Sequence, residues 1–415
     1  MTTRTYTYRH TTYSCYRGYI TQAIINNLAP LLFIIFRTSF GITYEQLGLL
    51  VLANFAVQLL TDIWATRYAD VVGYRKCMVI AHALCTLGLI ALGILPLALP
   101  SHYLGLILAV ALYAIGGGLL EVIVSPIVEA LPNENKEASM SLLHSFYCWG
   151  QMIVVFLSTL VISIIGRDLW FILPIAWSLF PLYNMFQFMH VPILPLVKQG
   201  KGMKLKDLLS APTFYLTILL MVCAGAGELT MSQWSSMFAE KGVGVPKLLG
   251  DLLGPGLFAL FMAIGRTIYG HYGERLPLRS CLAGSSILCV LTYLVTVFYT
   301  NPVISLLACS LTGLSVSLMW PGTFSVASAA FPRGGTLLFG ILAIFGDVGC
   351  SVGPWLAGKI SDAVEQGNLT PNLWAGNGFN LEQIGLRSGL LAAVIFPALM
   401  LAGLLLFRKK RTSKL

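Results

Sequence analysis

A single carboxylate interrupts one of the most apolar stretches of the sequence, residues 114–126. Glu121 follows three consecutive glycines, Gly116–Gly118, and precedes Ser125 and Pro126. A charged side chain near the centre of a bilayer is costly, so such residues usually belong to ion or proton pathways. We interpret Glu121 as a residue that binds a proton or another cation. The alternative is a packing seam of small residues, in which a protonated Glu121 donates a hydrogen bond between closely spaced helices.

A second carboxylate, Glu228, lies in a segment rich in Gly and Ala. On a helix, Ser232 shares its face at position i+4. A sugar suits such a surface, because carboxylates accept hydrogen bonds from hydroxyls while an aromatic ring covers the C–H face of the sugar. Trp234 and Trp320 are candidates for that ring, although Trp234 fits an interfacial aromatic belt equally well. We therefore predict that Glu228 binds substrate or takes part in cation coupling.

Polar residues recur at helical spacing in two other apolar segments. His144, Tyr147 and Gln151 stand at positions i, i+3 and i+7, with Cys148 between them, and Gln22 and Asn26 stand at i and i+4. Residues with this spacing share one face of a helix. Both stripes are predicted to line a substrate cavity, and Asn27 is a further candidate. His144 is either a hydrogen-bonded structural residue or part of a proton relay.

Two aspartates lie in apolar segments, and for them the sequence allows either a structural or a functional role. Asp347 precedes a Gly353-Pro354 break, which frees backbone carbonyls that need partners. It either stabilises that distorted helix or forms a second cation site. Asp62 lies two turns before Asp70, and we favour a structural role for it, against the helix that carries Asp347.

The composition fixes the class of protein that must position these residues. Of 415 residues, 57% are hydrophobic and only 10% are charged, which indicates a polytopic membrane protein. A helix needs about 20 apolar residues to cross a bilayer. Twelve such spans are predicted, at residues 19–37, 45–66, 77–99, 103–131, 141–165, 169–190, 213–238, 249–272, 280–299, 302–330, 336–358 and 386–407. The predicted fold class is therefore all-α and integral to the membrane.

The basic residues predict the orientation of these spans. Of the 26 Lys and Arg residues, 20 fall on the side of the two termini and 6 on the other. Loops rich in Lys and Arg stay in the cytoplasm, so both termini are predicted to be cytoplasmic. The net charge of +9 then reflects topology and attraction to anionic lipid headgroups. We find no solvated basic domain that would bind nucleic acid.

The sequence also has the appearance of two copies of one unit. A basic linker at 191–211 separates residues 1–190 from residues 212–415, and each half is predicted to form a six-helix bundle. Gly118 precedes Pro126 by the same interval at which Gly313 precedes Pro321. Internal repeats of this kind are typical of secondary transporters, whose substrate sites lie near the midplane between the repeats.

A glycine-containing basic turn follows both the second and the eighth span. The first copy, Asp70-x-x-Gly73-x-Arg75-Lys76, resembles the loop motif of the major facilitator superfamily, although Thr66 stands where that motif begins with Gly. The chain resembles this family over nearly its whole length. The resemblance implies two pseudo-symmetric six-helix bundles and a cytoplasmic latch between them. The candidate latch residues are Asp70, Arg75, Lys76, Arg266 and Arg275.

Within that superfamily the chain most resembles the fucose-permease-like sugar:cation symporters. The resemblance rests on the Glu121 helix with its Ser125-Pro126 pair, on Asn26-Asn27, and on Glu228 in its Gly/Ala-rich helix. Where this family has an aspartate after the asparagine pair, the chain has Pro30. The resemblance implies that Glu121 lies on the helix of the coupling carboxylate, whereas Glu228 and Asp347 are candidates for cation coupling because they are carboxylates in apolar segments. It also implies sugar transport through the polar residues named above.

These observations predict a cation-coupled secondary active transporter that moves a small polar solute, a sugar or polyol, by alternating access. The coupling ion is expected to be H⁺, with Na⁺ as the alternative. We expect no cofactor, no metal centre and no enzymatic activity, because the sequence holds neither a GxxxxGK[ST] run nor a nucleophile–base or metal-ligand pattern. The partners expected are the solute and the lipid bilayer, with the chain acting as a monomer in a bacterial inner membrane, the plasma membrane of its cell.

Three other functions fit the same architecture. One is a proton-coupled efflux pump for amphipathic compounds, for which a wide cavity with one carboxylate would suffice. A second is a lipid flippase, suggested by the basic cytoplasmic face. The third is a transporter-like sensor or receptor that binds solute without moving it.

Overall fold

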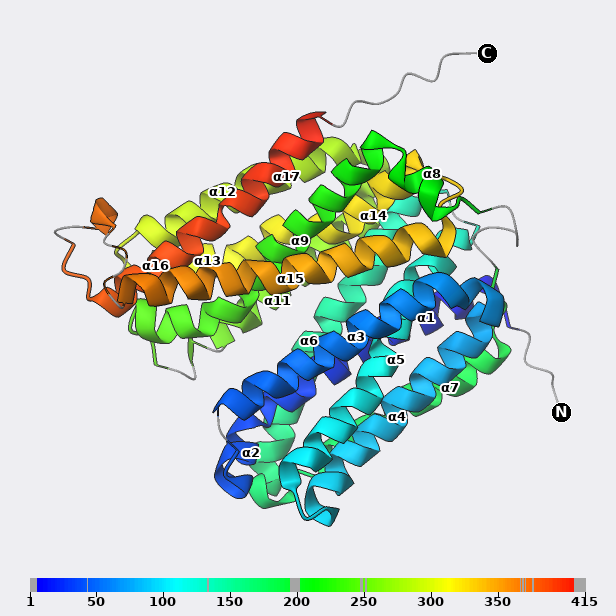
Figure 1. The fold of residues 1–415 in the computed structure, drawn as a ribbon, viewed down its shortest axis with the longest axis horizontal. Coiled ribbons are helices and arrows are strands. Elements are labelled where there is room, and N and C mark those ends of the chain that lie inside the picture. Colours follow the sequence, from blue (N-terminus) through cyan, green and yellow to red (C-terminus); the bar gives the residue numbers. More distant parts are fainter. Residues whose placement is uncertain are drawn as a thin grey trace. The chain divides into compact units, whose positions relative to one another are not determined.

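The structure is a computed structural model. It describes residues 6–42, 44–132, 134–194, 202–246, 249–250, 252–365, 367, 369, 371–374 and 377–406. Within these residues the regular structure is entirely helical, as Figure 1 shows. The chain divides into two compact units. Unit 1 comprises residues Met1–Met203 with Pro332–Ile344, and unit 2 comprises Lys204–Phe331 with Phe345–Leu415.

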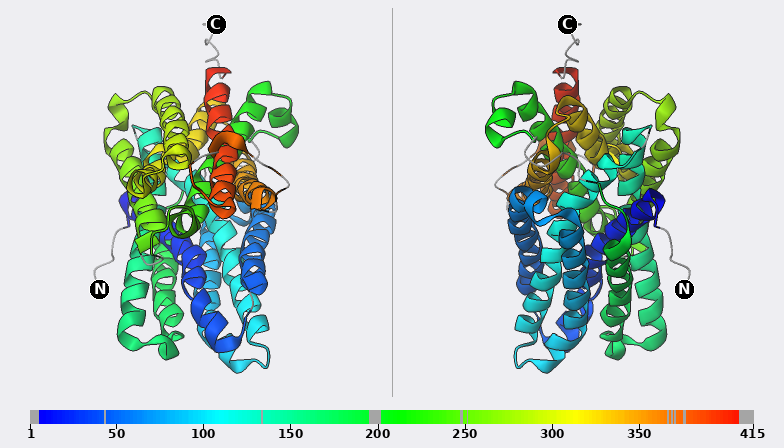
Figure 2. Two further views of the ribbon diagram at one scale, coloured as in Figure 1. Left: turned by 90° about the vertical axis from the view of Figure 1, so that its left-hand side faces the viewer. Right: turned by 90° about the vertical axis from the view of Figure 1, so that its right-hand side faces the viewer.

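The helices of unit 1 are long, and Figure 2 shows them from two further directions. They are α1 (Tyr8–Leu31), α2 (Phe33–Phe40), α3 (Tyr44–Val72), α4 (Tyr74–Ala98), α5 (His102–Ala130), α6 (Lys136–Ile165), the short η1 (Arg167–Leu169) and α7 (Ile172–His190). The first part of α15 (Gly335–Glu365) also belongs to this unit. Helix α5 packs against α1, α3 and α4, and α4 packs in turn against α7 (Figure 1).

Unit 2 contains the remaining helices. They are α8 (Leu205–Leu209), α9 (Pro212–Met237), η2 (Phe238–Gly242), η3 (Leu252–Gly256), α11 (Leu257–Tyr272), η4 (Gly273–Arg275), α12 (Leu278–Phe298), α13 (Pro302–Val316), α14 (Met319–Ala330), η5 (Asn372–Trp374), α16 (Leu381–Ala393) and α17 (Ile395–Leu406), with the rest of α15. Helix α9 packs against α13, α14 and α17, while α12 packs against α13 and α17.

The predicted membrane spans coincide with these helices. Nine helical segments in the described part of the chain are long and apolar enough to cross a bilayer. Some spans are broken into two helices: the first is α1 with α2, the tenth is α13 with α14, and the twelfth is α16 with α17. The prediction of an all-α, twelve-span membrane fold is confirmed.

Glycines allow the helices around α5 to approach closely. A Cβ atom at Gly116 would lie 2.5 Å from the carbonyl oxygen of Ala81 on α4, and one at Gly118 would lie 2.7 Å from a carboxylate oxygen of Asp62 on α3. Neither contact leaves room for a methyl group. The three glycines before Glu121 therefore bring α3 and α4 against the helix that carries it.

Several helices begin at side chains that accept hydrogen bonds from their first turn. Ser101 begins α5, Asn135 begins α6, Asn301 begins α13 and Asn380 begins α16. Each accepts a hydrogen bond from a backbone N–H that has no partner within the helix. Pro302 follows Asn301 at the first helical position, where its missing N–H costs nothing.

Two arginines cap the carboxyl-terminal ends of neighbouring helices. In unit 1, Arg75 donates to the carbonyl oxygens of Phe188, Met189 and Val191 at the end of α7, at 2.8–2.9 Å. In unit 2, Arg387 donates to the carbonyl oxygens that end α12, including Val297 at 2.7 Å. A cation beside the free carbonyls of a helix end is stabilising. Arg75, which the sequence assigns to the latch, therefore also fixes the end of α7.

Candidate functional site

Four helices of unit 1 contribute polar side chains to a layer in its interior, and most of these side chains are hydrogen-bonded to one another. We call this set the polar layer. It consists of Tyr19, Gln22 and Asn26 from α1, of Asn54, Gln58 and Asp62 from α3, of Glu121 and Ser125 from α5, and of His144 from α6. Four of these nine residues were predicted to belong to the site: Gln22, Asn26, Glu121 and His144.

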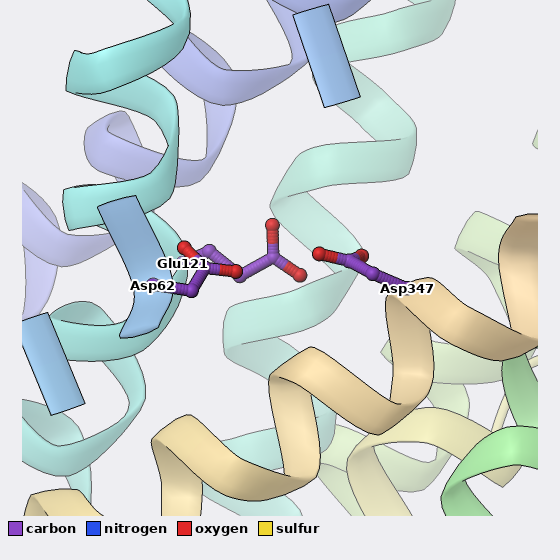
Figure 3. A group of neighbouring side chains, drawn as sticks. All are labelled: Asp62, Glu121 and Asp347. Atoms are coloured by element: carbon purple, nitrogen blue, oxygen red, sulfur yellow. The ribbon is translucent and has the colours of Figure 1, made fainter. Parts of the chain in front are cut away.

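Two carboxylates lie close together within the layer, as Figure 3 shows. One oxygen of Asp62 lies within 4.8 Å of one oxygen of Glu121. Asp62 is fully buried, and Glu121 accepts a hydrogen bond of 2.8 Å from the Gln22 amide. Two negative charges at this separation in a poorly solvated interior repel strongly. The pair is therefore suited to holding a proton or another cation between its members.

Asn26 joins α1 to α3. Its side-chain oxygen accepts hydrogen bonds from Gln58 at 2.9 Å and from Asn54 at 3.2 Å. Space for Gln58 comes from Gly117 on α5, where a Cβ atom would lie 3.2 Å from the side-chain amide. Asn26, one turn after Gln22 on α1, thus extends the polar layer from α1 to α3.

A tyrosine connects α1 to the other two helices of the layer. The Tyr19 hydroxyl lies 2.9 Å from the Ser125 hydroxyl and 3.2 Å from Nε2 of His144. All three side chains are buried. His144, for which a cavity-lining or relay role was predicted, is therefore a hydrogen-bonded member of the layer, and its neighbour Ser125 lies one turn of α5 after Glu121.

The other unit 1 candidates lie on α1 and α6. Asn27 donates at 2.9 Å to the carbonyl oxygen of Ala23, which is one turn earlier in its own helix. Tyr147 and Gln151 lie on α6 and are partly exposed. Their predicted roles in substrate binding remain predictions.

Unit 2 contains a buried ion pair. Nη2 of Arg266, on α11, lies 2.8 Å from Oε2 of Glu228, on α9. The Nε atom of Arg266 donates at 2.8 Å to the carbonyl oxygen of Ser317, at the break between α13 and α14. The sequence places Arg266 in the cytoplasmic latch and does not predict this pairing. The signal for it is present, however, because both residues are charged side chains in consecutive apolar spans.

The remaining candidates of unit 2 lie on α9, α14 and α15. The Trp234 indole N–H donates at 3.2 Å to the carbonyl oxygen of Pro354, and Trp320 packs against Gly346. Ser232 is partly exposed, as is Asp347, which is the third side chain in Figure 3. Both indoles thus hold their own helices, α9 and α14, against α15. Their proposed contact with a sugar remains a prediction.

The predicted latch motif makes a hydrogen bond within unit 1. The Thr336 hydroxyl, in the first turn of α15, donates at 2.7 Å to a carboxylate oxygen of Asp70, and the Tyr74 hydroxyl lies 2.5 Å from the same threonine oxygen. A carboxylate is stabilised beside the first turn of a helix. Lys76 and Arg275 are exposed. A latch through Asp70 remains a prediction.

Sequence reasoning missed the residues that α3 contributes. Asn54, Gln58 and Asp62 stand at i, i+4 and i+8, so they form a polar stripe on one face of an apolar helix. The same kind of spacing identified the α6 stripe. Asp62 was interpreted alone, against the helix of Asp347, and its neighbour Glu121 was not expected.

The sequence was compared with known proteins. Residues 18–354 match the family described as the Major Facilitator Superfamily. No curated protein sequence matches the chain significantly.

Solved structures of transporters share the fold at low sequence identity. A Major Facilitator Superfamily transporter, FucP, in the outward conformation is 17% identical, with a TM-score of 0.78 over 96% of this chain and 99% of that one. A single-residue variant of the E. coli fucose:proton symporter FucP is 16% identical, with a TM-score of 0.76 over 96% and 98%. The proton:xylose symporter XylE bound to 6-bromo-6-deoxy-D-glucose is 12% identical, with a TM-score of 0.76 over 94% of each chain.

Proposed function

The chain belongs to the major facilitator superfamily, and on this premise we propose that it is a cation-coupled secondary active transporter for a small polar solute. The coupling ion in this proposal is the proton, with Na⁺ as the alternative. The solute is a sugar or a polyol, and it moves by alternating access. The chain works as a monomer in a bacterial inner membrane, with both termini in the cytoplasm.

One observation carries the proposal of cation coupling: two carboxylates, Glu121 and Asp62, within 4.8 Å of each other inside an apolar bundle. Two carboxylates this close, one of them fully buried, do not both stay ionised without a compensating charge. A bound proton or Na⁺ supplies that charge. Loading and unloading of the pair is therefore a step that an ion gradient can drive.

The hydrogen bonds of α1 link this step to the solute. Gln22 donates to Glu121, and Asn26 and Tyr19 on the same helix bind residues of α3, α5 and α6. A solute that takes over any of these hydrogen bonds changes the environment of the carboxylate pair. Protonation in turn frees Gln22 from a charge-assisted hydrogen bond, which is stronger than a neutral one. In this proposal the solute and the proton are linked through α1, which contributes a residue to each of these hydrogen-bonded groups.

Two kinds of observation support a sugar or polyol. The polar layer offers amides, hydroxyls and an imidazole, which are donors and acceptors that match the hydroxyl groups of such a solute. Two of the structures with a similar fold are, by their own descriptions, a fucose:proton and a proton:xylose symporter. Their similarity to this chain is one of fold.

Reconstitution into liposomes tests the proposal. Vesicles with a pH-sensitive dye inside receive L-fucose, D-xylose, D-glucose or mannitol from outside, with and without Na⁺. We expect at least one of these solutes to acidify the vesicle interior or, for Na⁺ coupling, to enter only when Na⁺ is present. If none moves an ion while amphipathic compounds drive proton exchange, the protein is an efflux pump and the proposal is wrong.

A further inference from the structure

Unit 2 has a carboxylate paired with a cation, Glu228 with Arg266, whereas unit 1 has two carboxylates close together, Glu121 and Asp62. We propose that Arg266 is a positioning residue that determines specificity. It keeps Glu228 ionised, so that this carboxylate is a fixed acceptor for the hydroxyl groups of an uncharged solute and carries no proton. This inference rests on the proposed transport function. It also separates Glu228 from the coupling role that the sequence suggests.

The guanidinium group of Arg266 is held from two sides. Nη2 contacts Glu228, and Nε donates to the carbonyl oxygen of Ser317 at 2.8 Å. That carbonyl lies where α13 ends and α14 begins, so the guanidinium group spans α9, α11 and the break in the tenth span. The Tyr293 hydroxyl donates at 2.9 Å to the carbonyl oxygen of Gly227, next to Glu228, and fixes α9 at this level.

The charge state of the pair follows from the chemistry of arginine. A guanidinium group stays protonated in proteins. If Glu228 took up a proton, Arg266 would become a buried cation without its counter-charge, which is strongly unfavourable. The opposite holds for Glu121, whose carboxylate neighbour Asp62 favours uptake of a proton. The two intramembrane glutamates therefore differ in the sign of their nearest charge.

The accessible end of the pair is the carboxylate. The side chain of Arg266 is 3% exposed, whereas that of Glu228 is 16% exposed. Exposure of an ionised carboxylate to lipid would be costly, so this surface is expected to face an aqueous path. Oε2 of Glu228 binds Arg266, and in this proposal Oε1 accepts from a solute hydroxyl.

The net charge of the pair predicts the class of solute. Glu228 and Arg266 together are neutral, so a solute with a full charge would disturb a balanced pair. An uncharged polyhydroxylated solute gains a charge-assisted hydrogen bond without changing that balance. We therefore expect L-fucose or D-xylose to be preferred over charged analogues such as D-glucuronate and D-glucosamine.

Paired substitutions in reconstituted vesicles test the inference, with uptake of L-fucose and D-xylose and proton entry measured together. Glu228→Gln is expected to raise KM on the order of tenfold or more, because a hydrogen bond to a charged acceptor is lost. The number of protons carried per sugar should stay unchanged. The double variant Glu228→Gln with Arg266→Gln removes both charges, so it should be better folded than Arg266→Gln alone while its KM remains raised.

Two results would overturn the inference. A fall in protons per sugar in Glu228→Gln would show that Glu228 carries a proton, and a wild-type KM in the double variant would show that the pair serves only to hold the helices together. Glu274→Gln is the matched control, because Glu274 lies in η4 with an exposed side chain. If the wild type shows no sugar-driven ion flux at all, the proposed function itself is wrong, and this inference is lost with it.

Discussion

At the scale of single residues, the neighbours of each acid determine what it can do. Glu121 has a donor, Gln22, at 2.8 Å and a second carboxylate, Asp62, within 4.8 Å. Glu228 has a guanidinium group at 2.8 Å. In the first span, Pro30 stands where the fucose-permease-like symporters have an aspartate. In this chain Asp62, on α3, lies close to Glu121 and brings a second carboxylate to it.

Replacement of Asp62 by Asn should separate stability from function. The substitution removes the repulsion between Glu121 and the fully buried Asp62 carboxylate, so we expect the melting temperature in detergent to rise by about 2 °C or more. Ion-driven accumulation of sugar should fall, because Glu121 then needs no compensating cation. Thermal unfolding and vesicle uptake measure the two effects. Asp168→Asn, at an exposed position in η1, is the control, and a lower melting temperature for Asp62→Asn would contradict the account.

At the scale of helices, spacing along the sequence predicts which side chains share a face but not which helix that face meets. The Gln22–Asn26 and His144–Gln151 stripes could be recognised from their spacing, as could the small residues around Glu121. The partners of these residues could not be recognised, because they are distant in the sequence. Tyr19 and His144, for example, are hydrogen-bonded although 125 positions separate them. The pairing of Glu228 with Arg266 was not predicted either, although the two charged residues are only 38 positions apart and lie in consecutive apolar spans.

Gly118 should be among the positions least tolerant of substitution on α5. A methyl group there would lie 2.7 Å from the Asp62 carboxylate and from the carbonyl oxygen of Gln58. We expect Gly118→Ala to destabilise unit 1 by roughly 1–3 kcal/mol, the usual cost of overpacking, and to reduce transport. Gly284→Ala on α12 is the matched control, because a Cβ atom at Gly284 meets nothing within 4 Å. Equal melting temperatures for the two variants would refute the close packing of α3 on α5.

At the scale of the whole molecule, the sequence predicts the fold most securely. Twelve apolar segments, short connections and a repeated Gly-Pro interval all indicate one transporter architecture, and the helices and the family match confirm it. The helix breaks at Leu32, Leu318 and Val394 were not predicted, because apolar sequence continues through each of them. Hydrophobicity reports the length of a span, whereas a break depends on local hydrogen bonding.

The predicted orientation can be tested with reporter fusions. The distribution of Lys and Arg places both termini in the cytoplasm, and the turn at Gly166 between α6 and α7 on the opposite side. Alkaline phosphatase fused after Gly166 should be active in a bacterial host, because the enzyme needs the oxidising periplasm. The same enzyme fused at the carboxyl terminus should be inactive, whereas green fluorescent protein should fluoresce there. The reverse pattern would invert the proposed topology.

The central claim is that Glu121 couples solute movement to an ion, and Glu121→Gln tests it most directly. Sugar counterflow needs no release of the coupling ion, whereas accumulation against a gradient does. Both are measured in the same vesicles, with Glu274→Gln as control. We predict that Glu121→Gln retains counterflow and loses accumulation. Accumulation at the wild-type level, with the same dependence on the ion gradient, would contradict the claim.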